Sequence, residues 1–255
     1  MGYLHEGHLS LIRIAKERSD VVILTIFVNP TQFAPNEDLA QYPRDFDRDK
    51  SLAENSGVDI LFAPPTAEMY ADGFVTYVSV EKLTSVLEGK ARPTHFRGVT
   101  TIVAKLFNCS RPHIAVFGQK DAQQAAVIKQ MAKDLDFDID IVVGPIIREA
   151  DGLAMSSRNV YLSLDERRES PVLHASLTMA EEMIRGGERS AGRIISAMTN
   201  LIAEKPHARI DYISVADLHH LEEQSVLSTG EEVLISLAVR FGRTRLIDNT
   251  IITVP

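Results

Sequence analysis

The run VVILTIFV at residues 21–28 decides the fold class of this chain. A near-continuous apolar and β-branched run of this length is typical of a strand buried on both faces, as in a parallel sheet. Shorter runs of the same kind lie at 59–62 and 113–117. Apolar residues at helical spacing lie before, between and after them, at 8–19, 99–107 and 125–135.

Strands that alternate with helices predict an α/β fold with a Rossmann-like, doubly wound parallel sheet. The pattern changes after about residue 160, where helices come first and strands follow. This order predicts a smaller C-terminal α+β domain, so we expect domains at 1–154 and 155–255. The expected helices are 165–186, with Pro171 as a boundary or kink, and 191–204; the expected strands are 211–215, 233–240 and 244–253.

The chain opens directly on a polar turn, whereas a sheet of this type should offer a strand before its first phosphate-binding turn. We therefore expect a first strand to be missing from this chain.

Composition excludes several functions. The formal net charge of the 255 residues is −8, which disfavours a broad contact with nucleic acid. No apolar run approaches the roughly 18 residues that cross a bilayer. The single cysteine, Cys109, rules out an internal disulfide and is compatible with a reducing cytosol. We expect a cytoplasmic protein without nucleic-acid or membrane partners.

Polar signatures follow the expected strands at their carboxyl ends, where open α/β sheets bind ligands. Asn29-Pro30-Thr31-Gln32-Phe33 follows the first run, and Gly118-Gln119-Lys120-Asp121 follows the run at 113–117. His5-Glu6-Gly7-His8 opens the first helix. Three such signatures predict a binding site along one edge of the sheet.

The HEGH turn at 5–8 suits a phosphate group. A helix N-terminus presents unpaired N–H groups and a partial positive charge, and Gly7 allows close approach of the backbone. His5 and His8 are three residues apart, so both imidazoles can donate hydrogen bonds from one side of the helix. The alternatives are a capped helix start with two surface histidines or part of a metal site, although no further zinc ligands at suitable spacing stand out.

Lys120 can place a positive charge on an α-phosphate during in-line displacement. Asp121 is a candidate helix cap, and Gln123 and Gln124 in the first turn of that helix are typical of solvated surface. Asn29 and Gln32 can hydrogen-bond a carboxylate or hydroxyl, although asparagine-proline is also an ordinary turn.

Met155-Ser156-Ser157-Arg158 follows Asp151-Gly152 at the junction of the two halves. Two hydroxyls and a guanidinium form a compact phosphate-binding set, and the glycine would let the loop close on a ligand. The alternative is a polar interdomain loop.

Together these segments resemble the pantothenate synthetase (pantoate–β-alanine ligase) family over essentially the whole chain. HxGH and MSSR-type loops also occur in class I aminoacyl-tRNA synthetases as HIGH and KMSKS, but the combination is more specific. The matching stretches are MGYLHEGHLSLI at 1–12, FVNPTQF at 27–33, DLAQYPR at 38–44, LEGKARPTHFRGVTTIV at 87–103, FGQKDAQQ at 117–124, READGLAMSSRNVYLS at 148–163 and RLIDN at 245–249.

The resemblance implies a two-step ligation in a homodimer. ATP converts the carboxylate of (R)-pantoate into pantoyl adenylate, and β-alanine then displaces AMP to give pantothenate. Mg²⁺ would be bound mainly through the phosphates, without dedicated protein ligands.

The resemblance also implies roles for individual residues. His8 would be the active-site acid and Lys120 would stabilise the α-phosphoryl group. Pantoate would contact Gln32, Gln124 and Asn29, and β-alanine would contact Gln32. The implied ATP contacts are Met1, Gly2, Tyr3, Leu4, His5, Glu6, Gly7, His8, Gly118, Gln119, Lys120, Asp121, Ile147, Met155, Ser156, Ser157 and Arg158. The stretch 87–98 would border the acid pocket, with no assigned role for Arg92, His95 and Arg97.

Three other readings remain open. One is another H-x-G-H nucleotidyl transferase, against which NPTQF and GQKDxQQ argue. Another is a tRNA-charging or RNA-binding relative, for which the chain is short and lacks a basic patch with interleaved aromatic residues. The last is an inactive, truncated relative.

Overall fold

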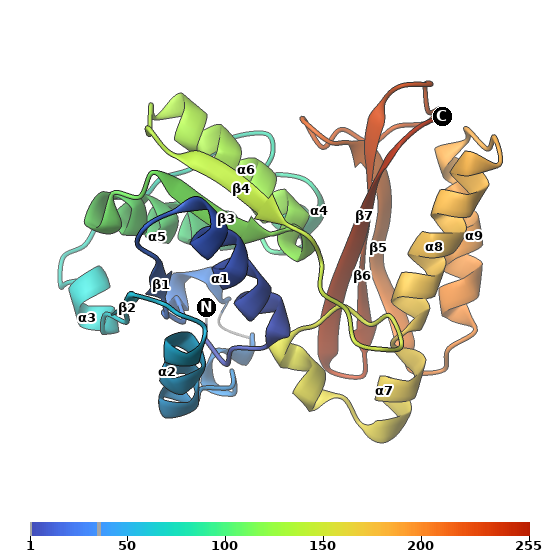
Figure 1. The fold of residues 1–255 in the computed structure, drawn as a ribbon. Helices are drawn as coiled ribbons and strands as arrows, with labels where there is room; N and C mark the ends of the chain where they lie inside the picture. The colour runs from blue at the N-terminus through green and yellow to red at the C-terminus, as the bar shows by residue number, and fades with distance from the viewer. Residues whose placement is uncertain (1, 35–36) are drawn as a thin grey trace. The chain divides into compact units, whose positions relative to one another are not determined.

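The computed structural model describes residues 2–34 and 37–255 and groups the chain into two compact units, Met1–Pro145 and Ile146–Pro255 (Figure 1). Each unit has its own sheets and helices. The domain boundary expected between residues 154 and 155 stays a prediction.

The first unit contains a parallel ladder of β1 (Ile23–Thr25) and β2 (Ile60–Phe62), in which Ile23 pairs with Ile60. β1 covers only three of the eight residues expected to be a strand. At its start the N–H of Val22 donates to the Asp59 carboxylate at 2.8 Å instead of to a strand carbonyl. A side chain therefore takes the place of a backbone partner at this end of β1.

A second parallel ladder joins β3 (Ile114–Gly118) and β4 (Asp140–Gly144). Successive strand residues point to opposite faces. The ring of Phe117 lies 6.5 Å from that of Phe107 in α5 (His95–Ser110), whereas a Cβ on Gly118 would face Leu11 of α1 (Glu6–Arg18). Helices therefore cover both faces of this ladder, as a doubly wound fold requires.

These ladders confirm an α/β fold with parallel strands. In the described residues the parallel strands form two separate pairs, β1–β2 and β3–β4, where one continuous sheet was expected. The further N-terminal strand is not tested by this structure and stays a prediction.

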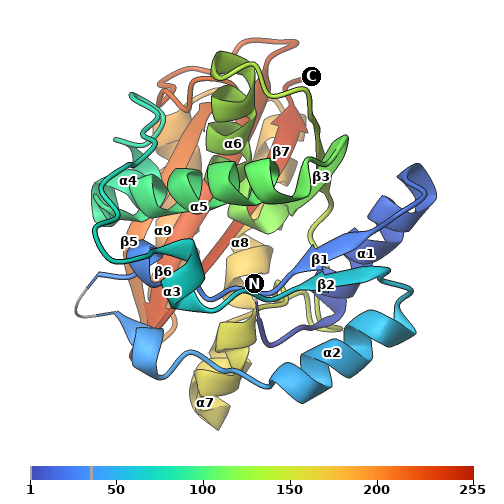
Figure 2. The same ribbon diagram turned by 90° about the vertical axis from the view of Figure 1, so that its left-hand side faces the viewer.

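The remaining helices of this unit connect the strands (Figure 2). α1 begins two residues earlier than expected. α2 was not predicted because it has few apolar residues, and the Asp45 side chain caps it by accepting from the N–H of Arg48 at 3.1 Å. The elements are η1 (Pro30–Gln32), η2 (Asp38–Ala40), α2 (Phe46–Asn55), α3 (Thr66–Met69), α4 (Leu87–Ala91), η3 (Gln119–Asp121) and α6 (Ala122–Asp134).

One hydrophobic cluster unites α1, α2 and the first ladder. Its buried members are Leu4, Ile12, Val22, Leu24 and Ala53. α1 thus packs on the first ladder while its Leu11 faces the second, so one helix fixes the polar turn before it relative to both pairs of strands.

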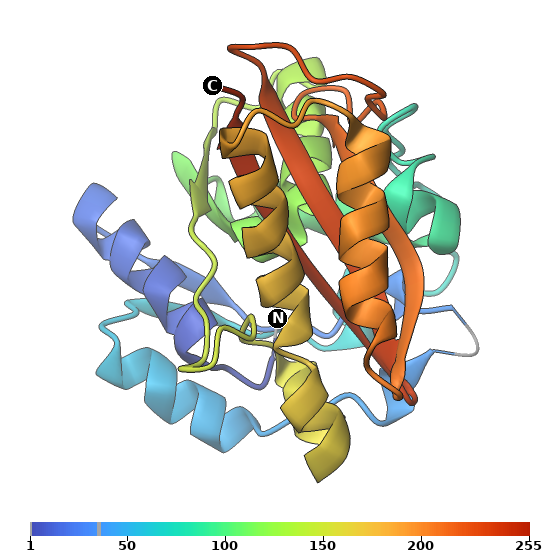
Figure 3. The same cartoon turned by 90° about the vertical axis from the view of Figure 1, so that its right-hand side faces the viewer.

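The second unit is an antiparallel sheet, in the order β5-β6-β7, covered by two helices (Figure 3). Alternate residues of β6, from Val233 to Phe241, pack with α8 and α9 in one core. The elements are η4 (Ser157–Tyr161), α7 (Leu164–Glu169), α8 (Val172–Arg185), α9 (Ala191–Ala203), β5 (Ala208–Asp217), β6 (Glu232–Phe241) and β7 (Thr244–Thr253).

The boundary expected at Pro171 is confirmed, because α7 ends at Glu169 and Pro171 is the N-cap of α8. A proline lacks the N–H that a continuous helix would need there. Among the described residues, no helix is long and apolar enough to cross a membrane.

Helix α5 contacts the η1 turn very closely at Gly98. A Cβ at Gly98 would lie 2.4 Å from the carbonyl oxygen of Thr31, and the Gly98 carbonyl accepts from the Asn29 side chain at 3.0 Å. Any larger side chain must push the turn away from the helix.

We expect Gly98→Ala to destabilise the protein by about 1–3 kcal/mol, because the added methyl overlaps backbone atoms that cannot rotate away. Calorimetric unfolding measures this effect. Gly192→Ala in α9 is the matched control, since a Cβ there meets only the Ser190 hydroxyl at 3.9 Å and alanine favours helix. Equal unfolding temperatures for the two variants would contradict a close contact between Gly98 and the η1 turn.

Candidate functional site

The segment before α1 is fixed by a buried carboxylate. The N–H groups of Tyr3 and Leu4 each donate to Asp49 at 2.6 Å, and Asp49 is 1% exposed. Tyr3 has a φ of 53°, a left-handed conformation that costs energy in a non-glycine residue. Asp49 stabilises this conformation, so it sets the direction in which the chain enters the HEGH turn.

The two histidines of the turn lie against each other, with ring centroids 4.0 Å apart. The backbone N–H of His5 donates to Nδ1 of His8 at 3.2 Å. Since Nδ1 accepts, the proton of neutral His8 is on Nε2. Burial, with the nearby charges of His5 and Lys120, lowers the pKa of His8 well below its usual value. At neutral pH His8 is therefore an uncharged hydrogen-bond donor.

Lys120 lies in η3, directly after β3, and its charge reaches His8. The close packing of α1 on the end of β4 depends on a glycine at position 144, because a Cβ there would lie 2.5 Å from the Leu11 side chain. α1 can thus pack against the ends of β3 and β4. The structure places His5 and His8 together and brings the charge of Lys120 to bear on His8; their binding of phosphate stays a prediction.

The Asn29 side chain, 2% exposed, is used within the fold. It donates to Gly98 and accepts from the N–H and hydroxyl of Thr31 and from the Tyr70 hydroxyl at 2.8 Å. These bonds shape the turn that carries Gln32. The expected contact between Asn29 and pantoate stays a prediction.

Gln32 is held through its backbone carbonyl, which accepts from Arg92 at 3.1 Å and from Nδ1 of His95 at 3.0 Å. Arg92 also donates to both carboxylate oxygens of Glu37. Burial alone would raise the pKa of Glu37, but the hydrogen bonds and charge of Arg92 outweigh it and lower that pKa. Two side chains of the segment 87–98 therefore bond directly to the backbone of Gln32.

The first turn of α6 departs from expectation. Asp121 makes no capping hydrogen bond with its side chain, so the predicted cap is wrong. Gln123 is buried rather than solvated, because its amide bonds to the backbone of Leu83, Val86 and Glu88. Gln124 is half-buried, and its contact with pantoate stays a prediction.

In the second unit, residues 147–155 form a short hairpin in which the N–H of Met155 donates to Ile147. Arg148 pairs with both oxygens of Asp248, at 2.6 and 3.1 Å, and donates to the carbonyl of Gly152. Asp248 is 2% exposed. Two segments 100 residues apart in the chain are thus joined at the base of the hairpin.

A second ion-pair group lies beside the hairpin. Arg167 donates to Glu149 at 2.6 Å and to Asp151 at 2.5 Å, and the hydrogen bond and charge of Arg167 lower the pKa of Asp151. Glu149 also accepts from Asn159. These contacts precede and follow Met155–Arg158, where the Ser156 hydroxyl caps η4 by accepting from the N–H of Arg158.

Each unit therefore carries its own part of the expected site. His5, His8, Lys120, Gln32 and Gln124 belong to the first, and Ile147 with Met155–Arg158 belongs to the second. Met1, one of the expected ATP contacts, lies outside the described residues.

Sequence reasoning missed Asp49, Glu37 and Asp248, which support the site residues without belonging to their motifs. An acidic residue among many gives no signal of its partner. Only the stretch RLIDN at 245–249, which matches the family, contains one of them, Asp248.

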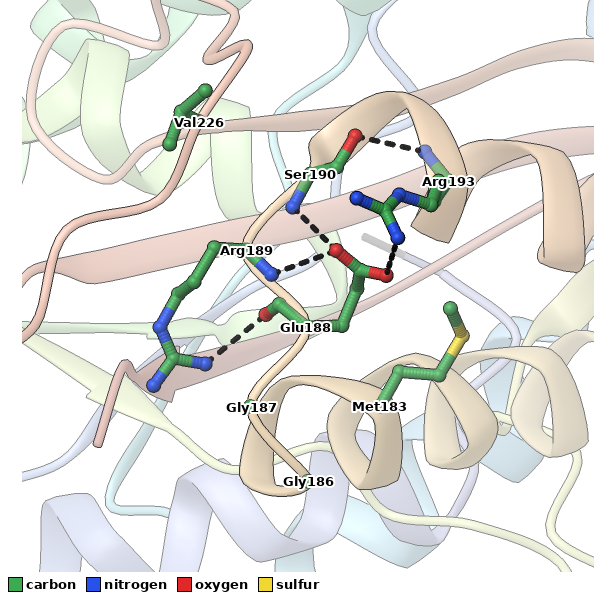
Figure 4. Close-up of a pocket in the computed structure, with 8 residues that line it drawn as sticks. All are labelled: Met183, Gly186, Gly187, Glu188, Arg189, Ser190, Arg193 and Val226. Atoms are coloured by element: carbon green, nitrogen blue, oxygen red, sulfur yellow. Dashed lines mark hydrogen bonds and ion pairs between the residues drawn. The ribbon is translucent and has the colours of Figure 1, made fainter.

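A surface pocket of the second unit contains none of these residues (Figure 4). Its positive side chains have partners: Arg189 donates to backbone carbonyls, and Arg193 pairs with Glu188 at 3.4 Å. The lining residues are Met183, Gly186, Gly187, Glu188, Arg189, Ser190, Arg193 and Val226.

Over residues 2–34 and 37–255, no group of three or more histidine, cysteine or carboxylate side chains is arranged to hold a metal ion. The nitrogen donors at His5, His8 and Lys120 do not suit Mg²⁺, which prefers oxygen ligands.

The parallel ladders, with an H-x-G-H turn at the start of α1 and a lysine whose charge acts on His8, are those of an α/β enzyme. The chain belongs to the pantoate–β-alanine ligase family, whose family model matches residues 1–251. The members of this family are ligases.

Relatives match along almost the whole chain. The pantothenate synthetase of Acetivibrio thermocellus is 56% identical over 254 residues, covering 100% of this chain and 90% of the relative. The crystal structure of pantothenate synthetase from Thermus thermophilus has a TM-score of 0.93 at 44% identity, covering 98% of this chain and 90% of that one. The Francisella tularensis ligase, complexed with β-γ ATP and β-alanine, has a TM-score of 0.78 at 35% identity, covering 98% and 86%.

We expect Asp248→Asn to lower the free energy of unfolding by about 2–4 kcal/mol, because it leaves the Arg148 guanidinium facing an amide without its counter-charge. Urea unfolding of the purified variant measures this. Asp165→Asn is the control, since Asp165 pairs with Arg168 on the exposed surface and should change stability by less than about 0.5 kcal/mol. Similar losses in both variants would contradict a special role for the Arg148–Asp248 pair.

His95 should make the protein less stable in mild acid. Burial, reinforced by the charge of Arg92, lowers the pKa of His95 from 6.5 to about 4 in the folded protein. Between these values only the unfolded chain takes up the proton, so the free energy of unfolding falls as the pH falls from 6.5 towards 4.

From pH 7 to pH 5 we expect the wild type to lose about 2 kcal/mol more than His95→Asn, which cannot titrate. Urea unfolding at the two pH values measures the difference. Parallel losses would show that His95 is not held neutral by the fold.

Proposed function

We propose that this chain ligates (R)-pantoate and β-alanine to pantothenate, with ATP converted to AMP and pyrophosphate. The observation that carries the proposal is the group formed by His5, His8 and Lys120 at the start of α1, in a chain of the pantoate–β-alanine ligase family. The complex of the Francisella tularensis ligase with β-γ ATP and β-alanine supports ATP and β-alanine as substrates.

In the first step a pantoate carboxylate oxygen attacks the α-phosphorus of ATP. The bond from that phosphorus to the bridging oxygen breaks, so pyrophosphate leaves and pantoyl adenylate forms. This displacement needs alignment and neutralisation of charge more than covalent help from the protein. The Nε2–H of His8 and the ammonium of Lys120 are suited to donate to the phosphoryl oxygens.

In the second step the neutral amine of β-alanine attacks the pantoyl carbonyl carbon. The bond to the AMP oxygen breaks, the amine proton is released, and pantothenate and AMP are the products. AMP is a far better leaving group than the oxide or hydroxide that a free carboxylic acid would have to release.

The remaining roles extend the proposal to both units. Gln32 and Gln124 bind pantoate with Asn29 beside them, and Gln32 also binds β-alanine. Residues 1–8, 118–121, Ile147 and 155–158 contact ATP. ATP enters as its magnesium complex, with the ion held by phosphate oxygens. We also expect a homodimer in the cytoplasm.

Pantoate-dependent exchange of labelled pyrophosphate into ATP tests the first step, and AMP release with β-alanine tests the second. We expect His8→Ala and Lys120→Ala to reduce exchange by at least about 100-fold, because each removes a donor to the transferring phosphoryl group. Circular dichroism and thermal unfolding check that both variants fold.

Near-normal exchange in a folded variant would remove that residue from the mechanism. Exchange that needs a phosphorylated alcohol instead of pantoate would identify another nucleotidyl transferase. The Gly192→Ala variant serves as the active control, because Gly192 lies in α9, outside the proposed site.

A further inference from the structure

We propose that Arg92, His95 and Glu37 position Gln32 for substrate binding; this group is called the Gln32 clamp. The inference rests on the proposed function, in which Gln32 contacts both acids. It assigns a role to residues that the sequence leaves without one.

The first component is an ion pair with defined orientation. Arg92 donates through Nε to one oxygen of Glu37 at 2.8 Å and through Nη2 to the other at 2.6 Å. The two side chains are only 17% and 22% exposed, so water screens them poorly. A two-point contact fixes the plane of the guanidinium, which a lysine in the same place could not achieve.

The oriented guanidinium then contacts Gln32. The same Nη2 donates to the Gln32 carbonyl at 3.1 Å, while Nη1 lies 3.3 Å from Nε2 of His95. Arg92 can only donate, so Nε2 of His95 accepts. The proton of neutral His95 is therefore on Nδ1, which lies 3.0 Å from the same Gln32 carbonyl.

The protonation states in the Gln32 clamp are thus mutually consistent. Glu37 orients Arg92, Arg92 selects the His95 tautomer, and both Arg92 and His95 donate to one oxygen atom. The bonds of Arg92 to Glu37 and of Arg92 and His95 to Gln32 join residues 55 to 63 positions apart in the chain, so no local turn geometry requires them to form.

The opposite side of the turn is fixed as well. Gly98, one turn along α5 from His95, contacts the Thr31 backbone and bonds to the Asn29 side chain. The peptide group before Gln32 packs against Gly98 and the carbonyl after it is bonded to Arg92 and His95, so Gln32 has little freedom except in its side-chain torsions. A binding residue that is already oriented loses less entropy when the substrate arrives.

The test compares variants that keep or remove single contacts. Arg92→Lys keeps the charge and loses the two-point geometry, and Glu37→Gln removes the partner that orients Arg92. His95→Asn keeps a donor near the position of Nδ1, whereas His95→Gln does not. Arg168→Lys, in an exposed pair with Asp165, is the matched control.

Two measurements are made on each full-length variant. Steady-state kinetics give kcat and the KM values for pantoate and ATP. Hydrogen exchange followed by mass spectrometry reports on a peptide that contains residues 29–33, where the N–H groups of Gln32 and Phe33 are bonded within the turn.

We expect Arg92→Lys, Glu37→Gln and His95→Gln to raise the KM for pantoate about tenfold, as for the loss of one charge-assisted hydrogen bond. The KM for ATP should change much less, and exchange in residues 29–33 should become faster. His95→Asn should lie closer to the wild type than His95→Gln, and the control should match the wild type.

Several outcomes would overturn the Gln32 clamp. Unchanged exchange in residues 29–33 would show that it does not order the turn. Faster hydrogen exchange in residues 29–33 with an unchanged KM for pantoate would show that the ordered turn does not serve acid binding. The same conclusion would follow if the KM for ATP rose as much as the KM for pantoate. A Glu37→Gln variant with tighter pantoate binding would indicate that Arg92 contacts the substrate directly.

The proposed function and the Gln32 clamp fail in different ways. The proposed function is refuted if the wild-type protein shows no pantoate-dependent exchange of pyrophosphate into ATP. The hydrogen-exchange comparison needs no substrate, so it still decides whether these three residues order the turn.

Discussion

The carboxylate of Asp49 accepts two backbone N–H groups, from Tyr3 and Leu4, and much of the first unit depends on this contact. It compensates for the unfavourable left-handed conformation of Tyr3 and directs the chain into α1. α1 in turn packs on β1 and lies against the ends of β3 and β4. The position of His8 in the first turn of α1 therefore depends on a carboxylate more than 40 residues away in the chain.

Side chains that bind backbone groups recur at each candidate segment. Asn29 shapes the η1 turn, Arg92 and His95 hold the carbonyl of Gln32, and Arg148 bonds to the carbonyl of Gly152 beside Asp248. Turns have few backbone partners of their own, so such bonds supply the rigidity that strands and helices obtain from regular hydrogen bonding. A rigid turn keeps its neighbouring side chains in place before any ligand binds.

Much of the fold was predictable from periodicity. The strand at Thr244–Thr253 and the helix break at Pro171 are confirmed, and the helices at α5, α6 and α9 differ from expectation only at their ends. β4 was missed because only three consecutive residues of it, 141–143, are strongly apolar, and α2 because it has almost no apolar stripe. The separation of the parallel strands into two pairs depends on which backbones pair, which no local pattern contains.

The sequence by itself determined the family and the residue types of the candidate site, because motif spacing and side-chain chemistry are properties of the chain. Only the tertiary structure decided that His8 is a neutral donor, that Asn29 and Gln123 serve the fold, and that Glu37 orients Arg92. Protonation, burial and hydrogen-bond partners arise from neighbours distant in sequence, and a pattern of residues does not specify which of them meet.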